Sequence, residues 1–136
     1  MTEFRTVTED FSVSPQIAPE DVAAAAAQGY TLIINNRPDG EQPGQPTSAQ
    51  IEAQAKAHGL AYAHIPFAGR PTAEQARAVR NLAADADGKV LAFCRSGTRS
   101  ITAWSIGQAL AGDRQRDELL HLGADAGYDL SGALGG

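Results

Sequence analysis

Residues 89–111 have the sequence KVLAFCRSGTRSITAWSIGQALA, which joins an expected strand to an expected helix. Val90–Phe93 is a short apolar run of the kind that forms a buried strand. A helix is expected from about Ser100, because mainly apolar residues continue to Ala111. Cys94, the only cysteine of the chain, lies at the turn between the two elements.

Three residue types in this turn have complementary chemistry. The first N–H groups of a helix are unpaired and the helix dipole adds partial positive charge, so the turn attracts anions and favours the thiolate form of Cys94. Gly97 permits backbone conformations that turn successive N–H groups inward. Arg99 supplies a planar guanidinium that matches an oxyanion. The turn is therefore predicted to bind an anion beside a nucleophile, through the residues Arg95, Ser96, Gly97 and Thr98.

The alternative interpretation is that Cys94 is a structural cysteine, since free cysteines are often buried. A lone cysteine at the end of a strand is weak evidence of catalysis. Here the residues R-S-G-T-R-S and an expected helix follow it directly. This combination favours a catalytic thiol.

Length, charge and cysteine content limit the functions to consider. A chain of 136 residues with 43% hydrophobic and 20% charged residues predicts one globular domain, residues 1–136. The net charge of −5 argues against a general surface for nucleic acid or an anionic membrane. One cysteine excludes an internal disulfide, and no cluster of ligands predicts a metal or another cofactor. The N-terminus lacks the pattern of a signal peptide, so a cytoplasmic location is expected, with the oligomeric state open.

The rest of the chain alternates expected strands with expected helices. Strands are predicted within Phe4–Val13, Tyr30–Asn35, Leu60–Phe67 and Val90–Phe93. Helices are predicted after Pro19, from Thr47 to near Gly59, from Thr72 to Ala86, from about Ser100, and over Arg114–Leu122, with capping boxes at Thr47 and Thr72. The order predicts a three-layer α/β fold with a mainly parallel sheet between helices. The loops after Asn35, Phe67 and Phe93 are then expected to converge.

Secondary site candidates lie in these converging loops. The loop NRPDGEQPGQP contributes Asn36, Arg37 and Asp39, although it also fits a plain surface connection. His64 and Arg70 flank the end of the Leu60–Phe67 strand, and a structural role for His64 is favoured over a role in the site.

Other residues are given structural or surface roles. Trp104 is expected in the core, and His58 and His121 at the surface. Asp85 and Lys89 are predicted to be solvated charges. The end of the chain, from Gly127, is predicted to be a loosely attached tail.

The Cys94 turn resembles two groups of cysteine-dependent enzymes. Rhodanese-type sulfurtransferases often carry such a loop, with arginine at the fifth residue after the cysteine, as at Arg99 here. Protein tyrosine and dual-specificity phosphatases have histidine, cysteine, five further residues and arginine. This chain has Phe93 in place of the histidine and only four residues between Cys94 and Arg99.

The whole chain resembles a small bacterial family, the phosphatase-like domain of the beta-lactamase hydrolase-like protein. The resemblance runs from Phe4 to Leu130 and includes S-P-Q-I, I-I-N-N-R-P-D-G-E-Q-P-G-Q-P, A-Y-A-H-I-P-F, F-C-R-S-G-T-R-S and A-G-Y-D-L. It implies a fold like that of dual-specificity phosphatases. Members are described as phosphatase-like or as sulfurtransferases.

The resemblance to phosphatases implies a role for each residue of the turn. Cys94 would attack phosphorus, Arg99 and the loop amides would hold the phosphoryl oxygens, and Ser100 would assist departure of the thiolate. The aspartate that serves as general acid in such enzymes has no counterpart in Ala68-Gly69-Arg70, although Asp39 is a geometric alternative.

Three functions therefore stay open for the Cys94 turn. Phosphatase-type hydrolysis of a small anionic substrate is favoured by the whole-chain resemblance. Sulfur transfer through a Cys94 persulfide is the second, because its leaving groups need no acid. The third is a non-catalytic module that binds an anion or a protein.

Overall fold

The computed structural model describes residues 3–135, which form five strands and five helices. Along the chain these are β1 Arg5–Thr8, β2 Phe11–Ser14, α1 Asp21–Ala27, β3 Tyr30–Asn35, α2 Ser48–Ala57, β4 Ala61–His64, α3 Ala73–Asp85, β5 Lys89–Phe93, α4 Thr98–Ala111 and α5 Arg116–Asp125. Each predicted strand and helix has a counterpart in this order. The segment Phe4–Val13 contributes two short strands, and α4 begins at Thr98 rather than at Ser100.

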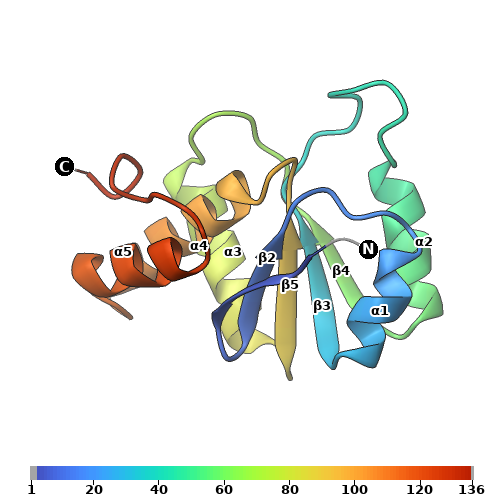
Figure 1. Ribbon diagram of the computed structural model, residues 1–136, viewed down its shortest axis with the longest axis horizontal. Helices are drawn as coiled ribbons and strands as arrows, with labels where there is room; N and C mark the ends of the chain where they lie inside the picture. Colours follow the sequence, from blue (N-terminus) through green and yellow to red (C-terminus); the bar gives the residue numbers. More distant parts are fainter. Residues whose placement is uncertain (1–2, 136) are drawn as a thin grey trace.

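The sheet has the strand order β1-β2-β5-β3-β4. Strands β2, β5, β3 and β4 are parallel to their neighbours, and β1 alone is antiparallel, paired with β2. Helices α1 and α2 lie on one side of the sheet, and α3, α4 and α5 lie on the other (Figure 1). The predicted three-layer α/β fold with a mainly parallel sheet is confirmed.

The central strand β5 packs against helices on both faces. Val90 and Ala92 belong to the core on the side of α3 and α4, while Leu91 and Phe93 belong to the core on the side of α1 and α2. All four side chains are 0% exposed. Alternate residues of a strand point to opposite faces, so an unbroken apolar run satisfies both cores.

Helix α4 is held against the sheet and against α3 by close packing. The Trp104 ring stacks on Phe11 with 4.8 Å between ring centroids, and Trp104 is 2% exposed, which confirms its expected place in the core. A Cβ at Gly107 would overlap the backbone oxygen of Ala76 in α3. Glycine therefore lets the two helices approach closely.

Both predicted capping boxes are present. The Gln50 N–H donates to the Thr47 hydroxyl over 3.1 Å, and the Thr47 N–H donates to the Gln50 side chain over 2.9 Å. Thr72 and Gln75 form the same pair of bonds at the start of α3. These bonds satisfy N–H groups that have no partner within the helix.

The prediction of a loosely attached C-terminal tail is wrong for its first residues. Tyr128 and Leu130 are 8% and 2% exposed and belong to the core on the α4 side. The Tyr128 N–H donates to the Gly123 carbonyl over 2.8 Å, which folds the segment back onto α5.

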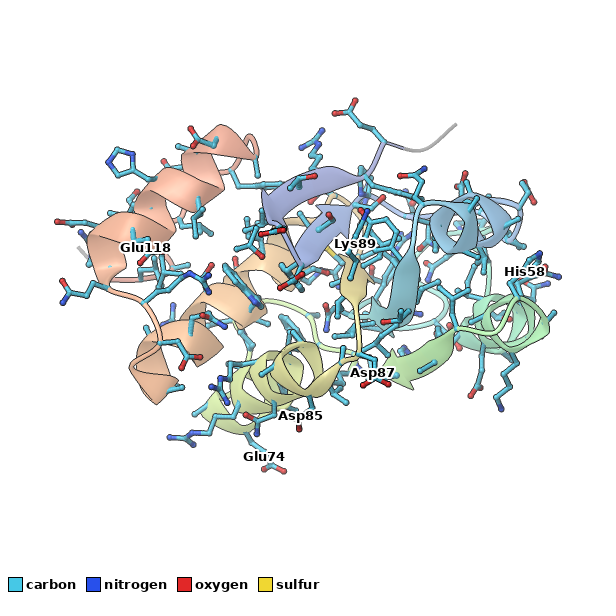
Figure 2. All side chains as sticks on the ribbon, turned by 90° about the horizontal axis from the view of Figure 1, so that it is seen from below. His58, Glu74, Asp85, Asp87, Lys89 and Glu118 are labelled. Atoms are coloured by element: carbon cyan, nitrogen blue, oxygen red, sulfur yellow. The ribbon has the colours of Figure 1, made fainter. Side chains whose placement is uncertain are left out.

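Lys89 also differs from its expected role as a solvated charge. Its ammonium donates to the Gln28 carbonyl over 2.9 Å and lies 4.3 Å from the centroid of the Tyr30 ring. Figure 2, seen from below, shows Lys89 and Asp87 near the start of β5 and Asp85 at the end of α3. Asp85 and His58 are exposed, as expected.

Within residues 3–135, no helix has the length and apolar character needed to cross a membrane.

Replacing Leu91 by alanine is predicted to lower the free energy of unfolding by about 2–5 kcal/mol, because it leaves a cavity in a close-packed core. Leu110→Ala is the matched control, since Leu110 is 47% exposed and its loss is expected to change stability by about 0.5 kcal/mol or less. Urea denaturation measures both. Equal losses for the two variants would contradict this description of the core.

Candidate functional site

The loops that follow the parallel strands meet at the carboxyl edge of the sheet. The Asn36 N–H donates to the Phe93 carbonyl over 2.8 Å, and the Gln16 N–H donates to the Arg95 carbonyl over 3.2 Å. The Arg99 guanidinium donates to the Phe67 carbonyl over 3.0 Å. The expected convergence after Asn35, Phe67 and Phe93 is therefore present, at the top of the sheet in Figure 1.

Cys94 lies at the centre of this edge, directly after β5 and 0% exposed. Its N–H donates to the Ser14 carbonyl over 3.4 Å, and its sulfur accepts the Gly97 N–H over 3.1 Å. Gly97 is the residue before α4, so the sulfur lies at the positive end of a 14-residue helix. We call residues 94–99 the Cys94 loop.

Gly97 has the left-handed backbone conformation that the loop needs, with φ of 93°. A Cβ at this position would also overlap the hydroxyl oxygen of Tyr128. Glycine is therefore required for two reasons, its backbone angle and the space beside it.

Arg99 is the last residue of the Cys94 loop and contacts the neighbouring loops. Its guanidinium donates two hydrogen bonds to Glu41, over 2.9 Å to Oε2 and over 2.8 Å to Oε1. The bonds to Glu41 raise the pKa of Arg99 above its ordinary value, and the nearby Cys94 sulfur acts in the same direction. Arg99 thus faces the sulfur and a carboxylate together.

Glu41 is the site residue that the sequence did not reveal. Hydrogen bonds from Arg99 and Arg37 lower the pKa of its carboxyl from 4.5 to about 2, so it is ionised at neutral pH. It is 58 residues from Arg99 in sequence and lies in an irregular loop with three prolines nearby. No local pattern connects it to the Cys94 loop.

Arg37 fixes the position of the loop that carries Glu41. It is 2% exposed, and its guanidinium donates to Glu41 over 2.8 Å, to Gln16 over 3.0 Å and to Gln42 over 3.0 Å. A buried guanidinium needs such partners to offset the loss of hydration. Arg37, a predicted secondary site residue, therefore reaches the site through Glu41.

Three other predicted residues form hydrogen bonds that join the loops to one another. Asn36 donates to the Ile65 carbonyl over 3.0 Å, and the His64 ring lies 2.9 Å from the Arg37 carbonyl oxygen. The Asp39 carboxylate accepts the Ser48 N–H over 2.8 Å, at the start of α2. Arg70, the last of the secondary candidates, is exposed.

The remaining residues of the predicted site lie in or next to the Cys94 loop. The Ser96 hydroxyl donates to the Thr98 hydroxyl over 3.0 Å, and Arg95 is exposed to solvent. Ser100, in the first turn of α4, is 0% exposed, and its hydroxyl has no hydrogen-bond partner among the described residues.

Two other features of residues 3–135 bear on the choice of site. These residues contain no group of three or more His, Cys, Asp or Glu side chains placed to hold a metal ion. A cleft of about 360 Å³ opens near the start of β5, lined in part by Phe11, Asp87 and Trp104. None of its lining residues belongs to the Cys94 loop, and it contains no cysteine. The Cys94 loop is the better candidate because it brings a thiol together with a guanidinium and the N–H groups at the start of a helix.

Comparison with known proteins assigns the chain to a family. Residues 3–111 match the family described as the phosphatase-like domain of the beta-lactamase hydrolase-like protein. The chain belongs to this family. A beta-lactamase hydrolase-like protein of Agrobacterium fabrum is 40% identical over 129 residues, which are 93% of this chain and 30% of that protein. This chain therefore spans about a third of the length of the curated relatives it matches.

Solved structures confirm the fold of this family member. A candidate phosphatase of Neisseria meningitidis superposes with a TM-score of 0.82 and 32% identity, over 94% of this chain and 91% of that one. A mutant form of Tk-PTP superposes with a TM-score of 0.72 and 18% identity, over 90% of this chain and 82% of its own, a likeness of fold alone. The domain has the fold of the cysteine-dependent phosphatases, as the resemblance implied.

Replacing Gly97 by alanine is predicted to lower the free energy of unfolding by about 1–3 kcal/mol, since it combines an unfavourable φ with an overlap. Gly59→Ala is the control, because Gly59 has φ of 79° with open space around it. Chemical denaturation of both variants measures the difference. If Gly59→Ala costs as much as Gly97→Ala, the contact with Tyr128 is not a constraint.

Replacing Glu41 by glutamine is predicted to destabilise the protein at neutral pH by removing a charge that two guanidinium groups share. The carboxyl has a pKa of about 2 in the folded protein and 4.5 ordinarily, so its contribution is complete above 4.5 and disappears as the pH falls toward 2. The difference in melting temperature between Glu41→Gln and the parent protein should be constant from about pH 7 to pH 5 and shrink below about pH 4.5.

Glu52→Gln is the matched control for this titration. Glu52 pairs with Lys56 over 3.4 Å at the surface of α2, where ion pairs contribute little to stability. Its effect on the melting temperature is expected to be small throughout. A Glu41 effect that does not change between pH 5 and pH 3 would contradict the charge pairing.

Proposed function

We propose that this domain hydrolyses small phosphate esters, with Cys94 as the nucleophile. The observation that carries the proposal is the Cys94 sulfur itself, which accepts the Gly97 N–H at the start of α4. The Arg99 guanidinium lies near the sulfur, which helps to raise the pKa of Arg99. These groups supply a nucleophile and a site for a tetrahedral anion together.

The reaction would proceed in two displacements at phosphorus. The Cys94 thiolate attacks phosphorus, an S–P bond forms, and the ester oxygen leaves with the electron pair of the broken P–O bond. Water then attacks phosphorus, the S–P bond breaks, and the sulfur departs as thiolate while inorganic phosphate is released. The Arg99 guanidinium and the loop N–H groups stabilise the charge on the phosphoryl oxygens. The Ser100 hydroxyl donates a hydrogen bond to the departing sulfur.

Substrate binding would exchange one anion for another at Arg99. The Glu41 carboxylate occupies the two terminal nitrogens of the guanidinium in the free protein. A phosphoryl group needs the same paired donors, so it competes with Glu41. Glu41 keeps its bond to the buried Arg37 and stays close to the site in this exchange.

The leaving group would depart without help from a carboxylic acid. The loop after β4 carries Ala68, Gly69 and Arg70, none of which is an acid. Glu41 has a pKa of about 2 and is already ionised, and Asp39 is bonded to Ser48. A positioned acid typically contributes about 10²–10⁴-fold, so esters with poor leaving groups are expected to react slowly.

A series of phosphate esters with leaving groups of increasing pKa tests this proposal. Nitrophenyl phosphate is expected to be hydrolysed, phenyl phosphate more slowly, and alkyl phosphates at least about 10²-fold more slowly than the aryl esters. Cys94→Ser should abolish phosphate release, and Arg99→Lys should reduce it by about 10²-fold or more. Equal rates for aryl and alkyl esters would contradict the absence of a general acid. Phosphate release by the Cys94→Ser variant would show that Cys94 is not the nucleophile.

A second candidate function is sulfur transfer, which the short loop favours. Only four residues separate Cys94 and Arg99, and the missing acid is no disadvantage when sulfite is the leaving group. The Cys94 thiolate would attack the outer sulfur of thiosulfate, and the S–S bond would break with its electron pair going to sulfite. Cyanide would then take the outer sulfur of the Cys94 persulfide, giving thiocyanate and free thiolate.

Thiosulfate with cyanide, offered beside the aryl phosphate, separates the candidates. Thiocyanate formed by the parent protein and not by Cys94→Ser supports sulfur transfer, whereas phosphate release supports hydrolysis. If neither product forms, the remaining candidate is a binding module. A titration with inorganic phosphate detects such binding without turnover.

A further inference from the structure

Tyr128 lies against the Cys94 loop although it belongs to the C-terminal segment, beyond residues 3–111 that match the family. The chain leaves α5 and turns at Gly127, which has φ of 95°. The Tyr128 N–H then donates to the Gly123 carbonyl, and the Tyr128 hydroxyl donates to the Ser96 carbonyl, each over 2.8 Å. Tyr128 is therefore fixed at both ends by backbone atoms, one of them in the Cys94 loop.

The Ser96 carbonyl and the Gly97 N–H belong to one peptide group. In a trans peptide these two groups point in opposite directions. The carbonyl accepts the Tyr128 hydroxyl, and the N–H donates to the Cys94 sulfur over 3.1 Å. A hydrogen bond at the carbonyl polarises the peptide and strengthens the bond that its N–H donates. Tyr128 and the sulfur are thus the two ends of one continuous chain of hydrogen bonds.

We propose that Tyr128 is a positioning residue for Cys94: its hydroxyl aligns the Ser96–Gly97 peptide so that the Gly97 N–H stabilises the thiolate. The inference rests on the nucleophilic role of Cys94 in the proposed function. It applies equally to hydrolysis and to sulfur transfer, because both begin with the thiolate.

The packing around Gly97 supports this role. The space where a Cβ would lie at Gly97 is filled by the Tyr128 hydroxyl oxygen. The Tyr128 hydroxyl therefore packs directly against Gly97 as well as bonding to the Ser96 carbonyl. Both contacts bring Tyr128 against the peptide group whose N–H donates to the Cys94 sulfur.

The charged groups around this chain of hydrogen bonds act alongside Tyr128. Arg99 in α4 faces the sulfur and is paired with Glu41, and Arg5 in β1 lies 5.2 Å from the Tyr128 ring centroid. Burial raises the pKa of the Tyr128 hydroxyl, as do Cys94 and Glu3, while Arg5 lowers it. The net direction is upward, so the hydroxyl keeps its proton and remains a donor at neutral pH.

The test is the reactivity of Cys94 in Tyr128→Phe, which removes the hydroxyl and keeps the ring. Iodoacetamide alkylates only the thiolate form of the single cysteine, and intact mass spectrometry follows the reaction at each pH. The midpoint of the rate against pH is expected to rise by about half to one pH unit, the equivalent of one lost hydrogen bond. The limiting rate at high pH should change little.

Tyr30→Phe is the matched control. Tyr30 is 6% exposed and its hydroxyl donates to Ser12 over 2.8 Å, away from the Cys94 loop. The same atom is lost from a similarly buried ring, so any general effect on stability is shared. The proposal requires the midpoint to move in Tyr128→Phe and not in Tyr30→Phe. Equal midpoints in both variants would overturn it.

A second measurement decides the question if Tyr128→Phe is only marginally stable. The Gly97 amide proton, observed by NMR in the parent protein and in the variant at low temperature, should shift upfield when its hydrogen bond to sulfur weakens. An unchanged shift would overturn the proposal. Alkylation needs no turnover, so a moved midpoint in a protein that releases neither phosphate nor thiocyanate would support the positioning role and reject the proposed function.

Discussion

The hydrogen bond from the Gly97 N–H to the Cys94 sulfur is the interaction on which the candidate site depends. Strand β5, buried on both faces, places Cys94 at the carboxyl edge of the sheet, and α4 begins at Thr98, directly after Gly97. The bond requires glycine at position 97, because φ is 93° and the neighbouring space is occupied. Packing on both faces of β5 therefore fixes the position of the Cys94 thiol.

Positive charge is concentrated at the candidate site, although the protein as a whole is negatively charged. The chain carries a net charge of −5, yet Arg37 and Arg99 converge on one carboxylate beside the sulfur. The buried Arg37 fixes Glu41, and Glu41 holds the guanidinium of Arg99 in the free protein. An incoming anion would meet an Arg99 guanidinium that is already oriented, but it would have to displace Glu41 from it.

Local sequence signals predicted most of the fold and the centre of the site. Apolar runs located β3 and β5, capping boxes located α2 and α3, and Cys94 lies in the predicted turn between β5 and α4. The contacts that were missed join residues far apart in sequence: Glu41 with Arg99, and Tyr128 with Ser96. Periodicity and capping describe neighbours along the chain, so they contain no information on such pairs. The segment from Gly127 is rich in glycine, so its sequence did not predict that Tyr128 and Leu130 are buried.

The most direct test of the account is the mass of Cys94 during reaction. Quenching in alkaline denaturant within milliseconds of mixing with nitrophenyl phosphate, followed by peptide mass spectrometry, should find about 80 Da added to Cys94, the mass of a phosphoryl group. Ser14 and Ser96 peptides should be unmodified. Phosphate release with no phosphoryl group on Cys94 at any time, or with the group on another residue, would contradict the account.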